Sequence, residues 1–161
     1  MKRPGYEEGT WFAVPLRDGG YGVGLVARKA RRGVLLGYFF GPRRRDVPKP
    51  SDVESLTPDQ AILVKLFGDL GLLEGSWPII GRSANWNRKA WPLPAFGRVV
   101  DFTGRALRIE YSDTNLPETI REIPVSPEEL EHLPEDGLSG AGAIEIVLSK
   151  RLRAREGNDK P

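Results

Sequence analysis

Few residues of this chain combine the types and spacings that catalysis needs. It has one histidine, His132, and no cysteine, so it carries neither a paired-histidine zinc signature nor thiolate ligands. The run Gly137-Leu-Ser-Gly-Ala141 fails the last position of the Gly-x-Ser-x-Gly nucleophile elbow. Adjacent carboxylates such as Glu128 and Glu129 are typical of a solvated polar surface rather than of an acid–base pair. We therefore predict no catalytic residue and no metal site.

One glycine-rich run has the letters of a nucleotide-binding motif. Gly22-Val-Gly-Leu-Val-Ala27 matches G-x-G-x-x-A. That motif requires a glycine turn between a strand and a helix, whose N-terminus then holds the pyrophosphate. Here the glycines lie inside an alternating strand pattern and no helical pattern follows. The run indicates a strand, and we expect no cofactor.

The segment Trp77–Gly97 is the strongest candidate for a binding surface. It holds three of the four tryptophans, and its prolines prevent a regular helix while stiffening the backbone. Tryptophan and arginine are enriched at binding hot spots, and a rigid loop presents them at low entropic cost. We predict a partner-binding surface around this loop, joined by two arginines from an earlier turn: Arg82, Asn85, Trp86, Asn87, Arg88, Arg43 and Arg44.

The three tryptophans of the segment are expected to differ in role. Trp77 and Trp91 are each followed by proline at the edges of the segment, and we predict that they close the core. Trp86 lies in a polar stretch, Ser83-Ala-Asn-Trp-Asn-Arg88, and we expect it at the surface. Partner binding should therefore depend mainly on Trp86.

Nucleic-acid binding is the main alternative to protein binding. The basic turns 28–32 and 43–45 would form a phosphate-binding cluster if they lay together at one end of a sheet. Trp86 and Trp91 would then be available to stack on bases. Against this alternative, the arginine run is short and the C-terminal part is acidic, so we rank nucleic acid below a protein partner.

Composition describes one globular domain. A chain of 161 residues can bury a single core, so we expect one domain over 1–161, with flexible ends at 1–9 and 155–161. Apolar runs are too short to span a bilayer and no secretory signal is visible, so we expect a cytoplasmic protein without a membrane partner.

Charge is unevenly distributed along the sequence. Residues 1–50 carry 11 Lys/Arg against 4 Asp/Glu, whereas residues 101–161 carry 8 against 13. Whether this asymmetry survives folding is left open by the sequence.

Hydrophobic periodicity predicts an α+β fold. Alternating patterns indicate strands at 10–16, 21–26, 34–40, 98–102, 107–111 and 119–123. Together they predict a curled, mainly antiparallel sheet of about six strands. A proline after Thr57 and an i, i+4 apolar row predict a central helix at 58–70. A short helix after Ser126 and a C-terminal helix at 141–153 complete the fold.

Several runs of aromatic, glycine and proline residues give the chain a family likeness. They are Gly9-Thr-Trp-Phe-Ala-Val-Pro-Leu16, Asp18-Gly-Gly-Tyr-Gly-Val-Gly-Leu-Val26, Leu35-Leu-Gly-Tyr-Phe-Phe-Gly41, Trp77-Pro-Ile-Ile-Gly81 and Trp91-Pro-Leu-Pro94. Together they resemble the immunity protein 26 family of bacterial polymorphic toxin systems. The resemblance covers roughly residues 5–125, and the segment 136–152 is not placed within it.

The resemblance implies an α+β fold and a role without catalysis. Such proteins are expected to be made beside a toxin and to neutralise it by direct binding inside the producing cell. The acidic C-terminal part would then imitate nucleic acid and bind a nuclease toxin. Alternatively, the basic N-terminal loops would bind an acidic partner. The sequence does not choose between these two possibilities.

Overall fold

The computed structural model describes residues 5–100 and 102–158. It has two β-sheets, and the predicted α+β class is confirmed. The larger sheet has six strands in the order β5-β1-β2-β3-β4-β9. These strands are β1 (Thr10–Pro15), β2 (Tyr21–Lys29), β3 (Val34–Arg44), β4 (Leu63–Gly68), β5 (Ile79–Arg82) and β9 (Leu138–Ser139). All neighbours are antiparallel except β4 and β9, which run parallel.

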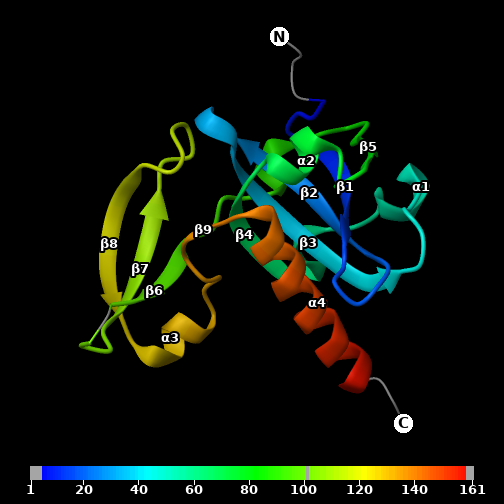
Figure 1. Cartoon of the computed structure of the whole chain (residues 1–161). Coiled ribbons are helices and arrows are strands. Elements are labelled where there is room, and N and C mark those ends of the chain that lie inside the picture. The colour runs from blue at the N-terminus through cyan, green and yellow to red at the C-terminus, as the bar shows by residue number, and fades with distance from the viewer. Residues whose placement is uncertain (1–4, 101, 159–161) are drawn as a thin grey trace.

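A second, three-stranded sheet stands beside the first (Figure 1). It is antiparallel and consists of β6 (Phe96–Val99), β7 (Ala106–Tyr111) and β8 (Thr119–Val125). Three of the predicted strands, at 98–102, 107–111 and 119–123, thus belong to this small sheet, although residue 101 lies outside the described residues. The larger sheet instead includes three strands that the sequence analysis does not predict: β4, β5 and β9.

Four α-helices accompany the sheets within the described residues: α1 (Pro50–Val53), α2 (Leu70–Glu74), α3 (Pro127–Glu131) and α4 (Ala141–Asn158). The C-terminal helix α4 lies across one face of the larger sheet (Figure 1) and continues beyond the predicted end at Arg153. No helix in these ranges is long and apolar enough to cross a membrane.

The predicted central helix at 58–70 is wrong. Residues Pro58–Gln60 form one 3-10 turn, and the chain then enters strand β4. Gln60 does accept a hydrogen bond from the backbone N–H of Thr57 at 2.9 Å, so the capping signal is real but opens only a single turn. Because β4 is buried on both faces, its apolar residues do not alternate cleanly with polar ones. That pattern mimics a helical stripe.

Burial of both faces gives the larger sheet two cores. In β3, Leu35 and Phe39 face the core beneath α4, whereas Leu36 and Phe40 face the opposite core. A Cβ atom at Gly22 would lie 2.5 Å from the Leu148 side chain, so this glycine lets α4 approach the sheet closely. The second core is covered by α1, by the segment around Trp91 and by the edge of the small sheet.

The two predicted core tryptophans lie in different cores. Trp77 is 1% exposed and packs beneath α4, where its ring stacks on Phe12 at 5.5 Å between centroids. Its indole Nε1 donates a hydrogen bond to Glu145 of α4 at 2.8 Å. Trp91 is 8% exposed and belongs to the opposite core. Their predicted burial is confirmed.

Candidate functional site

Two hollows flank the segment Ser83–Trp91, which follows β5 and is called loop 83–91 below. One hollow, the charged pocket, has a volume of about 610 Å³ and is entered by Arg88 of the loop. The other, the tryptophan pocket, has a volume of about 330 Å³ and is lined by most of the loop. Loop 83–91 therefore offers both apolar and charged groups to anything that docks on this side of the molecule.

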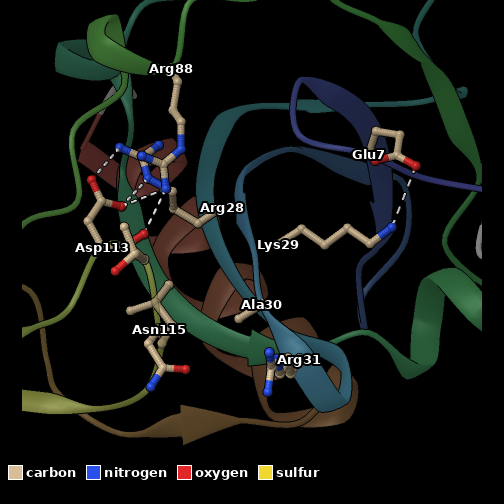
Figure 2. A pocket seen from close by; sticks show the side chains of 10 residues that line it. Glu7, Arg28, Lys29, Ala30, Arg31, Arg88, Asp113 and Asn115 are labelled. Carbon is tan, nitrogen blue, oxygen red and sulfur yellow. Dashed lines mark hydrogen bonds and ion pairs between the residues drawn. The ribbon is translucent and has the colours of Figure 1, made fainter.

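The charged pocket is organised around an ion-pair network at the end of β2. A register shift between β2 and β3 at Val26/Arg28 places the Arg28 side chain toward the turn that joins β7 and β8. Arg28 is only 3% exposed, and its Nε donates to Asp113 Oδ1 at 2.5 Å. Arg88 Nη2 donates to the same oxygen at 2.9 Å, and Arg88 Nε donates to Glu8 at 3.1 Å. Figure 2 shows the two arginines converging on Asp113.

This network ties together three separate parts of the chain. Arg28 comes from the larger sheet, Arg88 from loop 83–91 and Asp113 from the small sheet. On the other side of the pocket, Lys29 points away from them toward Glu7 (Figure 2), with an Nζ–carboxylate distance of 3.6 Å. Three of the four cations that line the pocket, Arg28, Lys29 and Arg88, are thus already paired, and Arg31 is the exception among the described residues. The pocket is therefore better suited to fixing the loop than to capturing an anion.

Asp113 makes this network sensitive to acid. Burial alone would raise the pKa of Asp113, but hydrogen bonding and charge interaction with Arg28, aided by Arg88, outweigh it and lower that pKa. A carboxylate with a lowered pKa contributes stability above the unfolded value, about 3.9 for aspartate, and loses it as the pH falls through the folded value.

Asp113→Asn is therefore expected to differ from the wild type in a pH-dependent way. The variant should have a lower unfolding free energy than the wild type, and this difference should be largest near pH 6. It should shrink steadily below about pH 4, because the Asp113 carboxyl of the wild type becomes protonated there while the asparagine of the variant does not titrate. Urea unfolding at a series of pH values measures it. A deficit that stays constant from pH 6 downward would contradict the role given to Asp113.

The tryptophan pocket is built from stacked and crossed indoles. Trp86 is half-buried and stacks on Trp91 at 6.4 Å with an interplanar angle of 26°. Trp91 in turn meets Trp11 edge-on at 5.9 Å and 83°. Gly9, with φ +89°, lies beneath the Trp86 ring, where a Cβ atom would be 3.0 Å away. Trp86 is thus less exposed than the sequence suggests, and it is held in a fixed orientation.

A tyrosine braces the floor of this pocket from the larger sheet. Tyr38 meets Trp91 edge-on at 5.1 Å, and its hydroxyl donates to the carbonyl of Pro92. Burial raises the pKa of Tyr38 to about 12, with a small opposing contribution from Arg28. The hydroxyl therefore stays protonated and able to donate at any physiological pH.

The predicted binding residues fall into two separate places. Arg82 lies on β5 directly before loop 83–91, and Asn85, Trp86, Asn87 and Arg88 lie within the loop. Asn85, Trp86 and Asn87 line the tryptophan pocket, and Arg88 lines the charged pocket on the other side of the loop.

Arg43 and Arg44 lie elsewhere, at the end of β3 beside the start of β2. Arg43 is held by Asp18 at 2.6 Å and by Glu156 at 2.9 Å. These two arginines are not part of the surface around Trp86.

The nucleic-acid alternative requires the basic turns 28–32 and 43–45 to lie together, and the structure does not meet this condition. Strands β2 and β3 form an antiparallel hairpin whose connection is the first of these turns, so the second turn lies at the opposite end. Residues 34–42 of β3 lie between them, which corresponds to about 30 Å of strand. The cationic cluster that would favour nucleic-acid binding is therefore not formed.

Folding also neutralises part of the charge asymmetry along the sequence. Ion pairs join the basic N-terminal part to the acidic C-terminal part: Arg17–Glu145 at 3.1 Å, Arg28–Asp113 at 2.5 Å and Arg43–Glu156 at 2.9 Å. Charges used in this way are not available to steer a partner.

Sequence reasoning missed the acidic members of the site. Asp113 reads as an ordinary turn residue, and Glu54 lies in a polar stretch just after α1. Nothing local marks either residue, because each reaches the site only through the tertiary fold. Glu54 lines the tryptophan pocket, and among the described residues it has no ion pair within 4.0 Å.

Comparison with known proteins identifies the family of this chain. The family model for immunity protein 26 matches residues 7–108, which is more than half of the chain. The chain belongs to the immunity protein 26 family, as the runs of aromatic, glycine and proline residues predict. Comparisons with curated proteins and with solved structures give no match. The matched range contains β1 to β6 and all of loop 83–91, whereas Asp113 and α4 lie beyond it.

Proposed function

We propose that this chain is the immunity protein of a bacterial polymorphic toxin system. It binds a cognate toxin domain in the cytoplasm of the producing cell and blocks it by occlusion, without catalysis. Membership of the immunity protein 26 family is the observation that carries this proposal. The partner is a protein, and neither a cofactor nor a membrane takes part.

We place the toxin-binding surface on loop 83–91 and the adjoining Arg82. Stacking on Trp91 orients Trp86, and bonds to Glu8 and Asp113 hold Arg88. A surface that is ordered before binding loses little conformational entropy when the partner docks. Asn85 and Asn87 are exposed beside Trp86 and supply hydrogen-bonding groups. Arg43 and Arg44 are left out of this surface because neither lines the two hollows beside the loop, and Arg43 is paired with Asp18 and Glu156.

Trp86→Ala is expected to weaken toxin binding more than it lowers folding stability. An aromatic hot spot contributes about 2 kcal/mol or more to binding. The lost stacking on Trp91 should cost about 1 kcal/mol of folding stability beyond the burial of the half-exposed ring, which leaves the two cores and their buried tryptophans in place. The assay is growth of cells that express the toxin domain encoded beside this gene, together with wild-type or variant chain.

Phe102→Ala supplies a matched control in the same assay. Phe102 is a fully exposed aromatic residue that follows β6, outside the proposed surface. Wild type and Phe102→Ala should rescue growth, and Trp86→Ala should do so poorly although it remains folded. A gene neighbourhood without a toxin domain, or a toxin that the wild-type chain does not neutralise, would overturn the proposed function.

A further inference from the structure

The tryptophan pocket has the size and walls of a receptacle for one side chain. Its volume of about 330 Å³ lies at the low end of the range for small-ligand sites, about 300–1,000 Å³. Trp11, Trp86 and Trp91 line it together with Leu56. Trp86 and Leu56 are half-buried and offer most of the accessible apolar surface, whereas Trp11 and Trp91 are 3% and 8% exposed. Such walls suit a long side chain that has an aliphatic stem.

The charge of the pocket selects a cation. Glu54 is the one ionisable side chain among its lining residues, and it is exposed and free of ion pairs within the described chain. Indole faces attract cations, and tryptophan is the strongest of the aromatic residues in this respect. Arg88 does not line this pocket, and its own charge is neutralised by Glu8 and Asp113.

Other occupants fit the pocket less well. An acidic side chain would face the Glu54 carboxylate at close range. An apolar side chain would remove water from Glu54 without giving it a partner, which costs free energy. A lysine or arginine places its stem against the indoles and its charged head beside Glu54.

We propose that the tryptophan pocket receives a lysine or arginine side chain projected by the toxin domain, with Glu54 as its counter-ion. This inference rests on the proposed function for the identity of the partner. The chemistry of the pocket can nevertheless be tested without the toxin.

The first test titrates the chain with N-acetyl-arginine amide and follows the indole N–H signals of the tryptophans by NMR. The signals of Trp86 and Trp91 should shift saturably, and that of Trp77, in the other core, should not. N-acetyl-norleucine amide, which keeps the stem but lacks the charge, should bind at least fivefold more weakly. Glu54→Gln should weaken arginine amide binding by a similar factor, and its spectrum reports whether the fold is retained.

Three results of this titration would overturn the inference. One is the absence of saturable shifts up to about 50 mM of the arginine probe, a concentration that would detect even a binding free energy near −2 kcal/mol. Another is equal binding of the norleucine probe, which would make the pocket purely apolar. The third is unchanged arginine binding in Glu54→Gln.

The second test compares Glu54→Gln with the wild type in binding the toxin domain. The inference predicts a loss of about tenfold in affinity. Unchanged affinity of the variant would sink the inference while leaving the proposed function standing. Failure of the wild type to bind the toxin would instead count against the proposed function, and the probe titration would then decide the chemistry of the pocket.

Discussion

Replacing Trp77 by alanine is expected to lower the free energy of unfolding by about 3–5 kcal/mol, the range for removing a fully buried large aromatic side chain. The ring is 1% exposed and stacks on Phe12 and Phe67 beneath α4. Its removal would leave a cavity between the sheet and the helix and would also break the hydrogen bond to Glu145. Urea unfolding followed by far-UV circular dichroism measures the change.

Trp77→Phe distinguishes the contribution of ring packing from that of the indole hydrogen bond to Glu145. It keeps most of the stacking but loses the indole donor, so its cost should be clearly smaller, about 1–2 kcal/mol. The exposed Phe102 again gives a surface control, with little expected effect. A Trp77→Ala variant as stable as Phe102→Ala would show that this core is not packed as described.

Replacing Asp113 by alanine has the second largest expected effect, about 3 kcal/mol, because it leaves a buried guanidinium without its carboxylate. The Arg28 side chain is 4% exposed, whereas that of Asp113 is 43% exposed. The loss therefore arises mainly from Arg28, which would keep, among the described residues, only its bond to the Ala27 carbonyl, at 2.6 Å. Equilibrium unfolding near pH 7 gives the value.

A double-mutant cycle tests the origin of that cost. Arg28→Met combined with Asp113→Ala should recover much of the stability lost in Asp113→Ala, because no unpaired charge then remains buried. Glu122→Ala is the matched control, since the one ion pair of Glu122 within the described ranges is an exposed pair with Arg98 at 3.9 Å. This variant should cost less than about 1 kcal/mol. Simple additivity in the cycle would contradict a coupled Arg28–Asp113 pair.

Local patterns predicted the parts of the fold that depend on neighbours in sequence. The hairpin of β1 and β2 follows from the Asp18-Gly-Gly turn and from period-two alternation, and the structure confirms it. The helix α3 begins after Ser126, whose side chain accepts a hydrogen bond from the backbone N–H of Glu129 as predicted. Strand β4 was mistaken for a helix because its two faces enter two different cores, which a single-face pattern cannot represent.

The site was only partly predictable for a similar reason. The segment Trp77–Gly97, which contains loop 83–91, stands out through its tryptophan and proline content. The burial of Trp77 and Trp91 follows from their positions in it. Arg28 and Asp113 are 85 residues apart in sequence and meet because the small sheet folds back beside the larger one. Glu54 reaches the tryptophan pocket through the position of α1. These long-range contacts follow from the topology of the fold, which local sequence patterns do not predict.

The most direct test of the central claim is a calorimetric titration of this chain with the toxin domain encoded beside its gene. We predict saturable binding by the wild type and by Phe102→Ala, and a loss of at least about tenfold in affinity, or about 1.4 kcal/mol, for Trp86→Ala. Absence of binding by the wild type, or equal affinity of Trp86→Ala and wild type, would contradict the assignment of loop 83–91 as the toxin-binding surface of an immunity protein.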